Sequence, residues 1–528
     1  MSTESNDREA RDLVQRLNAG KISRRSFVKR ATVLGLSVGS IGSILAACGG
    51  DDSSSEPAPA PAEEPAAPAE PAPAEPAAPA GPEGAGDEIA IEALQQFSGI
   101  TLNVNWEAGL QANDPKLVWG PQLEELTGIK INTIELDHGD LFTKAIAESI
   151  AGSGAYDILN IEPAWVPDLV AGNVIAPIDD WVAQYMPSAD LEDYAPLYQT
   201  MATWQGKRYG LFDDGDVLIL YYRKDIFDDL GLAVPATWDE FVATAETINA
   251  EVDGVDGADF WRNPGFQHWP FLQHFRALDG APFDPATMDA TLNTDVGVTV
   301  MNSLVAQNNA SATGVLEHDP VTVLNAWLGG TVGMMFWWPP PGRWSAGLVA
   351  GQEGFDFIAE STVADSVGYA VMPEGHGAHA SGFHVAVGAD SPNAEAAYLV
   401  AQWITSPKVS LDRVTQPISL RDPYRISHFN SDEFRGLWGD AGDYLDTLSA
   451  AADVAVTDFM VPGWQDYALA LDKGVTAVYA GDDPQSTLDG VVGEWDAITD
   501  RLGRDAQIEA WASYLETPGS TAANTIGG

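Results

Sequence analysis

The sequence predicts an α/β fold built on mostly parallel sheets with helices on both faces. From about residue 99 the hydrophobic pattern alternates strand, helix, strand, helix, strand at short spacing, which is typical of a parallel sheet. The chain has 528 residues and is 45% hydrophobic, so it can bury a sizeable core. More than one domain is expected at this length.

The predicted elements follow one another from residue 99 to residue 161. The first segment, GITLNVNW, alternates apolar and polar side chains as a half-buried strand does. We take Asp140 as the cap of the second helix, because an aspartate there can accept from free backbone N–H groups. The pattern gives strands over 99–106, 129–135 and 156–161, and helices over 115–126 and 140–151.

Parallel sheets bind ligands at the carboxyl ends of their strands. In this sequence those ends carry Trp106 and Glu107, then His138, then Glu162 and Trp165. The sequence therefore predicts a ligand site at this edge of the sheet.

The first residues read as an export signal. Arg24 and Arg25 precede SFVKR, and this resembles the twin-arginine signal. Residues 31–47 are uncharged but rich in Gly and Ser, and they are shorter than the roughly 20 apolar residues of a membrane span. We therefore expect residues 1–47 to be a signal peptide.

The single cysteine, Cys48, ends the sequence LAAC directly after this segment. That position resembles a bacterial lipoprotein box, in which the thiol is acylated and becomes the new N-terminus. Anchoring through lipid on Cys48 to the outer face of the cytoplasmic membrane is the prediction. A single cysteine leaves no disulfide within the chain.

Residues 48–90 contain a Pro/Ala/Glu tract, with ten of the 34 prolines between 57 and 82. Such a segment cannot bury apolar surface, and we expect a disordered, extended spacer. This order of signal, cysteine and spacer predicts a globular body that is tethered above a membrane.

The formal net charge is −51. Nucleic-acid binding needs a basic face, so this class of function is excluded. A solvated acidic surface, for example a salt adaptation, explains most of the charge. Carboxylates that bind a cation or a cationic ligand remain the alternative.

Several ordered motifs resemble family 1 extracellular solute-binding proteins of ABC transporters, the class that includes maltose-binding proteins. The motifs are AYDI at 155–158, AGNVIAPIDD at 171–180, GKRYG at 206–210, LYYRKDIF at 220–227, PATWDE at 235–240, GYAVMP at 368–373, SPNAEAA at 391–397 and WITSP at 403–407. Their order carries the resemblance more than any one of them.

The resemblance implies a two-lobed, periplasmic-binding-protein-like fold (type II) joined by hinge crossings. We place the crossings near 213–217, 381–384 and 459–463. Lobe one would be 99–214 plus 384–458, lobe two 215–383 plus 459–517, and 518–528 a flexible tail. The ligand would lie in the cleft, and closure would be a hinge motion.

A sugar presents apolar C–H faces and a rim of hydroxyls, so its site needs aromatic platforms and polar acceptors. Trp337 and Trp338 precede three prolines, which predicts a rigid exposed turn facing the cleft. The resemblance implies stacking by Trp165 and by Trp464, which would start a helix. Phe266 and Trp269 resemble a ligand-contacting loop, although packing at a helix start explains them equally well.

For polar contacts the resemblance implies a cleft carboxylate at Asp216, with Asp213 beside it. Glu107 and Glu162 could accept sugar hydroxyls in the same way, and Arg421 could donate. The complete candidate set for ligand contact is Trp106, Glu107, His138, Glu162, Trp165, Asp213, Asp216, Phe266, Trp269, Trp337, Trp338, Arg421 and Trp464.

The first rival hypothesis is an enzyme, such as a glycoside hydrolase with two carboxylates. The sequence contains no nucleophile elbow, no zinc helix and no phosphate loop. The second rival is a receptor for a polyamine or a metal, with the aspartates at 213–216 or 253–259 as ligands. These aspartates do not have EF-hand spacing. The third is a surface lipoprotein without a transport role.

We therefore expect a monomeric, extracytoplasmic binding protein for a small carbohydrate or polyol. Its partners would be that ligand, the permease of an ABC importer and the membrane. We expect neither a cofactor nor a metal nor catalysis.

Overall fold

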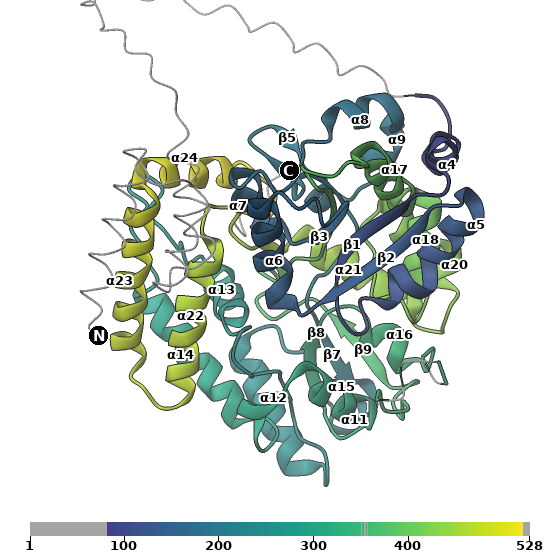
Figure 1. The fold of residues 1–528 in the computed structure, drawn as a ribbon. Helices are drawn as coiled ribbons and strands as arrows, with labels where there is room; N and C mark the ends of the chain where they lie inside the picture. The colour runs from purple at the N-terminus through teal and green to yellow at the C-terminus, as the bar shows by residue number, and fades with distance from the viewer. Residues whose placement is uncertain (1–81, 350, 353–354, 356, 521–528) are drawn as a thin grey trace, which may run out of the picture.

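The computed structural model describes residues 82–349, 351–352, 355 and 357–520. Its strands form two main sheets, which lie one above the other in the view of Figure 1. The larger sheet has the order β2-β1-β3-β11-β6 and the smaller one the order β8-β7-β9. The strands are β1 (Thr101–Glu107), β2 (Lys130–Leu136), β3 (Ile158–Ile161), β6 (Gly210–Phe212), β7 (Ile219–Arg223), β8 (Met334–Trp337), β9 (Val367–Ala370) and β11 (His384–Val387).

The first part of the larger sheet forms where the sequence predicts it. The three predicted strands correspond to β1, β2 and β3, and β1 pairs in parallel with both neighbours. The helix predicted over 140–151 is α6 (His138–Ala151). It begins earlier than predicted, with Asp137 as its N-cap, so the prediction that Asp140 caps it is wrong. Asp140 lies in the first turn, where a negative charge still favours the helix dipole.

The helix predicted over 115–126 is divided in two. A π-helical segment (Asp114–Trp119) precedes α5 (Gly120–Thr127). Pro121 offers no backbone N–H to the preceding turn, so the regular α-helical ladder is interrupted at this point.

Parallel pairing joins β1 to β2 and β3, but the expectation of mostly parallel sheets is wrong for the other strands of the two main sheets. Strand β11 pairs antiparallel with both β3 and β6, and β7 pairs antiparallel with both β8 and β9. The reason is the path of the chain, since β6 leads out of the larger sheet toward β7 and β11 brings the chain back. Residues 213–218 and 371–383 make these two passages between the sheets.

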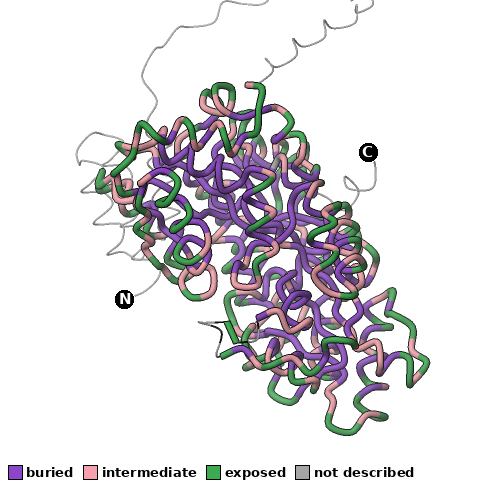
Figure 2. Tube along the Cα trace, turned by 90° about the vertical axis from the view of Figure 1, so that its right-hand side faces the viewer, coloured by how far each residue is buried: buried purple, intermediate pink, exposed green. Residues whose placement is uncertain are grey.

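Helices cover both sheets and form a separate block beside them. The helical block, teal and yellow in Figure 1, consists of α13 (His268–Ala277), α14 (Asp295–Asn309), α22 (Trp464–Tyr479), α23 (Pro484–Leu502) and α24 (Arg504–Leu515). Helices α4 (Gly86–Leu94) and α17 (Ala394–Thr405) pack on the larger sheet. Helices α11 (Lys224–Leu230), α12 (Trp238–Glu251), α15 (Pro320–Leu328) and α16 (Pro341–Ser345) lie around the smaller one in Figure 1. Figure 2 shows buried chain through the interior of both parts and exposed chain mainly at loops.

The two ends of the described chain are held more firmly than the sequence predicts. Helix α4 begins at Gly86, inside the predicted spacer 48–90, because Ala90 and Leu94 are buried in the core. Arg276 donates a hydrogen bond to the carbonyl of Gly519 (2.8 Å), inside the predicted flexible tail. The signal and lipidation residues Arg24, Arg25 and Cys48 lie outside the described residues. Among the helices that are described, none is both long and apolar enough to cross a membrane.

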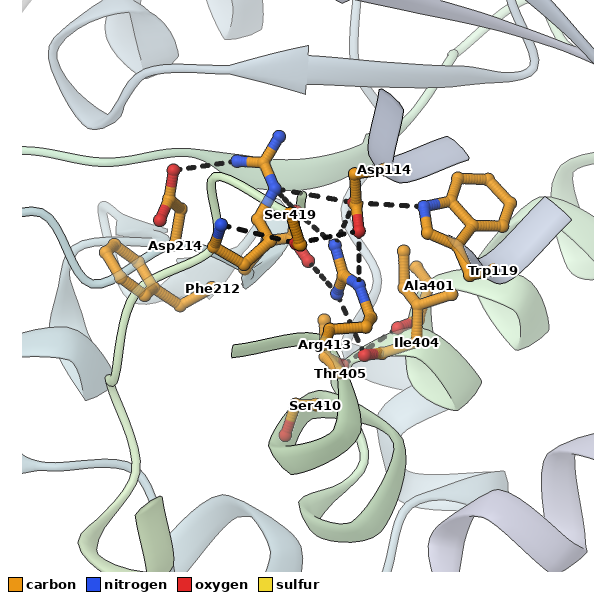
Figure 3. Close-up of polar contacts among 12 residues, drawn as sticks. Asp114, Trp119, Phe212, Asp214, Ala401, Ile404, Thr405, Ser410, Arg413 and Ser419 are labelled. Atoms are coloured by element: carbon orange, nitrogen blue, oxygen red, sulfur yellow. Dashed lines mark hydrogen bonds and ion pairs between the residues drawn. The ribbon is translucent and has the colours of Figure 1, made fainter. Parts of the chain in front are cut away.

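A network of buried charges joins distant parts of the chain where the sheets meet (Figure 3). Arg413 forms ion pairs with Asp114 and with Asp213 (2.5 Å), and Arg421 pairs with Asp214 (2.8 Å). All five side chains are 0–1% exposed. Burial alone would raise the pKa of Asp114, but the charges of Arg413 and Arg421 and their hydrogen bonds lower it below its usual value.

The same network reaches the smaller sheet through α16. Arg343 on this helix donates to Asp422 (2.8 Å) and to the carbonyls of Val414 and Arg421. Burial raises the pKa of Asp422 to about 6, while the charge of Arg343 opposes this rise. Burial and neighbouring carboxylates also raise the pKa of Asp216 well above its usual value. Ion pairs with arginine therefore balance the charge of some aspartates of this network, and raised pKa values favour the uncharged form of others.

Removing Arg413 should destabilise the protein strongly. The substitution Arg413→Met leaves Asp114 and Asp213 buried without their main cation, so we expect the free energy of unfolding to fall by about 3–5 kcal/mol. Urea denaturation measures this loss. The matched control is Arg501→Met, which breaks the partly exposed pair with Asp466 and should cost less than about 1 kcal/mol. Equal losses in the two variants would contradict a central role of the network.

Candidate functional site

A cavity of about 410 Å³ lies at the carboxyl ends of strands from both sheets. Glu107 is the last residue of β1, His138 opens α6 just after β2, and Glu162 directly follows β3. Because parallel strands end at the same edge of a sheet, these three side chains converge on one wall. Trp337, the last residue of β8, and Trp338 also line the cavity.

His138 lies between the two glutamates. Its Nε2 is 3.3 Å from Oε1 of Glu162, and its Nδ1 is 3.5 Å from Oε2 of Glu107. Burial works to lower the pKa of His138, but the charge of Glu162 and the hydrogen bond and charge of Glu107 raise it to about 9. His138 is therefore a cation at neutral pH.

The same surroundings favour the charged form of His138 but the neutral form of Glu162. Burial is the largest cause that raises its pKa to about 7, the charges of Asp458 and Glu107 add to the rise, and His138 opposes it. A carboxyl group with this pKa exchanges a proton near neutral pH. It can accept a hydrogen bond from a ligand in one state and donate one in the other.

The aromatic rings that line the cavity support one another. Trp338 stacks on Trp261 behind it, with ring centroids 4.9 Å apart and an angle of 9°. Trp269 meets Trp338 edge to face at 5.8 Å and 82°, and Phe266 lies 5.5 Å from Trp269. Such offset and edge-to-face contacts are the favourable ones, so these rings form a rigid apolar surface.

Trp269 is also held by polar contacts. Its Nε1 donates to Oδ2 of Asp458 (2.9 Å), and the other oxygen of Asp458 is 3.3 Å from Nε2 of His379. The ring of His379 stacks on Trp269 at 4.8 Å. Burial would raise the pKa of Asp458, but His379, His268 and the hydrogen bonds keep it below its usual value. The ring of Trp269 is thereby fixed in one orientation.

The structure brings eight of the candidate residues to the cavity wall. They are Glu107, His138, Glu162, Asp216, Phe266, Trp269, Trp337 and Trp338. The expectation that Trp337 and Trp338 form an exposed turn is wrong. Trp337 is a strand residue with 5% of its surface exposed, and Pro341 begins α16 directly behind the pair.

The structure places three tryptophans of the predicted ligand-contact set in the core instead. Trp106 is fully buried against Trp119, because side chains alternate along a strand and its neighbour Glu107 faces the cavity. Trp165 is 2% exposed and packs behind His138 at 5.8 Å. Trp464 does begin a helix, but it is 1% exposed and packs on Phe459 at 4.7 Å. These three tryptophans have packing roles.

The predictions for Asp213 and Arg421 are corrected in the same way. Both are fully buried and engaged in the charge network, so neither offers a free group to a ligand. The residue after Arg421, Asp422, lines the cavity in its place. Sequence reasoning missed Asp422 and also Phe383, which lies in one of the predicted crossings and faces the cavity.

Three carboxylates gather at one side of the cavity. Asp214, Asp216 and Asp422 have oxygens within 4.8 Å of one another, which is the geometry of a possible cation site. However, Arg421 pairs with Asp214 and Arg343 pairs with Asp422, each at 2.8 Å. This arrangement favours compensation by arginine and by protons over a bound metal ion.

A family model, bacterial extracellular solute-binding protein, matches residues 105–410. The chain is 26% identical to a probable amino-acid ABC transporter periplasmic-binding protein of Sinorhizobium fredii, over 61% of this chain and 74% of that protein. It is 24% identical to an erythritol/L-threitol-binding protein of Mycolicibacterium smegmatis, over 74% and 84% of the two chains. A ribitol complex of an ABC transporter solute-binding protein from Agrobacterium radiobacter K84 has the same fold, with a TM-score of 0.65 and 21% identity over 76% and 99% of the two chains.

The pair of glutamates around His138 predicts a pH-dependent stability. Because the pKa of His138 is raised from 6.5 to about 9, its surroundings favour the protonated ring, and this contribution to the stability of the folded chain is complete below pH 6.5. This contribution is lost as the pH rises through about 9. Urea denaturation should therefore show the wild type losing stability relative to His138→Gln between pH 6.5 and 9.

The control for this measurement is His376→Gln. His376 hydrogen-bonds the backbone carbonyl of Glu374 (2.8 Å) and lies outside the cavity wall. Its stability profile should run parallel to that of the wild type. A constant difference between the wild type and His138→Gln across this pH range would contradict the assignment.

Proposed function

Because the chain belongs to the family of bacterial extracellular solute-binding proteins, we propose that it captures a small carbohydrate or polyol in the cavity and delivers it to an ABC importer. One observation carries the choice of ligand class, namely that aromatic rings and carboxyl groups line the same cavity. The aromatic wall is formed by Trp269, Trp337 and Trp338, and the carboxyl wall by Glu107 and Glu162.

The two walls match the two kinds of surface on a polyhydroxylated ligand. Its C–H faces pack against the aromatic rings, which are rigid and lose little freedom on binding. Its hydroxyl groups donate to the carboxylates, and a hydrogen bond to an ionised acceptor is stronger than a neutral one. The cavity volume of about 410 Å³ lies in the range typical of small-molecule sites.

Named relatives support this choice of ligand. One relative is an erythritol/L-threitol-binding protein, and one structural neighbour holds ribitol. We carry over only the class of ligand, a small polyhydroxylated compound.

We propose that binding closes two lobes around the ligand. Lobe one is 99–214 plus 384–458, and lobe two is 215–383 plus 459–517. In support, β6 ends in the larger sheet and β7 begins in the smaller sheet only seven residues later, so residues 213–218 can act as a hinge. The contact between Gly463 and Asp168 (2.9 Å) ties the third crossing to helix α7 (Val166–Ala171) of lobe one.

A second candidate function is capture of a solute that is not a carbohydrate, such as a polyamine. The carboxyl groups of the cavity favour it, and one relative is named as an amino-acid binding protein. The aromatic wall fits a flat C–H face better than a flexible aliphatic chain, so we rank this candidate second.

We also propose that the protein is a monomer anchored by lipid on Cys48 and exported through the Arg24-Arg25 signal. The segment between Cys48 and α4 would then hold the body above the membrane.

A thermal-shift screen of sugars, polyols and polyamines tests the ligand class. A ligand at 100 times its Kd should stabilise the fold by about 2.7 kcal/mol, and we expect this from a sugar or polyol. Trp338→Ala should weaken that ligand about tenfold through the lost stacking surface. The control Trp181→Ala removes a partly buried ring that stacks on Tyr398 away from the cavity and should leave the affinity unchanged. Stabilisation by polyamines alone would make the carbohydrate proposal wrong.

Lipid anchoring is tested with Cys48→Ser. Without its thiol the chain has no acylation site, so the protein should leave the membrane fraction and incorporate no labelled fatty acid. Fractionation and metabolic labelling measure both outcomes. Persistent labelling of the variant would show that the lipid is attached elsewhere.

A further inference from the structure

Almost all of the ionisable side chains that line the cavity are carboxyl groups. Among the described residues, those that line it are Glu107, His138, Glu162, Asp216 and Asp422, with no lysine or arginine. A ligand with a phosphate or carboxylate group would therefore meet carboxylates with only one cationic side chain beside them. This composition disfavours an anionic ligand.

The carboxyl groups at one side of the cavity are already compensated. Asp422 pairs with Arg343 (2.8 Å) and shares a hydrogen bond with Asp216. Burial and neighbouring aspartates raise the pKa of Asp216 well above its usual value, so its surroundings favour the uncharged carboxyl group. Little negative charge is left there for a ligand to neutralise.

Around His138, the carboxyl groups of the cavity outnumber the cationic side chains by one. Glu107 and Glu162 share a single cation, His138, at 3.5 and 3.3 Å. Asp458 adds a further negative charge behind Glu162, although His379 and the indole of Trp269 hold it. Glu162 partly restores the balance by keeping a proton, since its pKa is about 7 in spite of the nearby His138.

The aromatic rings around His138 suit a cation. Phe266 and Phe383, which both line the cavity, lie 6.2 and 6.3 Å from the His138 ring. The faces of aromatic rings attract positive charge, and this attraction is greater where water is excluded. A second cation beside Glu162 and these two rings would gain both interactions.

We infer that the ligand is an amino sugar or an aminated polyol, whose ammonium group pairs with Glu162 and Glu107 while its hydroxyl-bearing carbons lie on the aromatic wall. This inference rests on the proposed function and narrows its ligand class. The ammonium replaces the proton that Glu162 holds in the free protein, so binding releases that proton to the solvent.

Isothermal titration calorimetry at pH 7 on the purified protein tests the inference with matched ligands. The probes are ribitol and D-glucitol, their 1-amino-1-deoxy analogues, the N-acetylated amines as uncharged controls, and putrescine as an amine without hydroxyls. We expect an amine to bind at least about tenfold more tightly than its parent polyol and its acetylated form. Titrations in buffers of different ionisation enthalpy should show proton release with the amine and none with the polyol.

Three variants decide which group is responsible. Glu162→Gln should bring the amine-to-polyol affinity ratio close to one and abolish proton release, and Glu107→Gln should lower the ratio by itself. His138→Gln removes the competing cation and should raise the ratio. The control Glu135→Gln alters a partly exposed glutamate of β2 that pairs with Lys116 outside the cavity and should leave the ratio unchanged.

The outcomes separate this inference from the proposed function. Binding of a polyol with equal or weaker binding of its amine overturns the inference and leaves the carbohydrate assignment standing. An amine preference that survives in Glu162→Gln also overturns it. Putrescine binding as tight as that of the aminated polyol makes the ligand a polyamine. If no probe binds, the inference is wrong, and the thermal-shift screen of sugars decides separately whether the proposed function stands.

Discussion

The buried charge network is the constraint on which the rest of the structure depends. Its members come from four separate parts of the chain, near residues 114, 213–216, 343 and 413–422, and ion pairs join them in the interior between the sheets. Burying such charges is costly, and apolar residues of similar volume often give equal stability. The network instead makes the fold specific, because the planar guanidinium group of each arginine binds its carboxylates only in a defined geometry. It fixes where the first passage between the sheets begins.

The network and the cavity share residues. Asp422 belongs to both, and Asp216 connects the first crossing with it. Arginines and protons satisfy the aspartates on this side, so the charge that remains available to a ligand is concentrated around His138 and its two glutamates. The aromatic wall is fixed by ring stacking and by the hydrogen bond from Trp269 to Asp458. Both walls are thus held in place by contacts behind them, which lowers the cost of ordering on binding.

Much of the fold and part of the site could be predicted from the sequence. The strands β1, β2 and β3 follow from local alternation, and their carboxyl ends gave Glu107, His138 and Glu162 correctly as cavity residues. Trp106 and Trp464 were misplaced, because a tryptophan beside a strand end or at a helix start can face either the core or the cavity. The antiparallel pairing of β11 could not be predicted, since it depends on how the chain returns from the smaller sheet.

The sequence by itself determined the α/β class, the acidic charge and the family resemblance, because these depend on local patterns and their order. The tertiary structure alone decided which carboxylates are consumed by arginines and which face a ligand. Asp213 and Asp216 lie three residues apart in one segment, yet the first is locked to Arg413 and the second lines the cavity. That difference arises from side chains hundreds of positions apart in the sequence, such as Asp114 and Arg413, which meet only when the chain has folded.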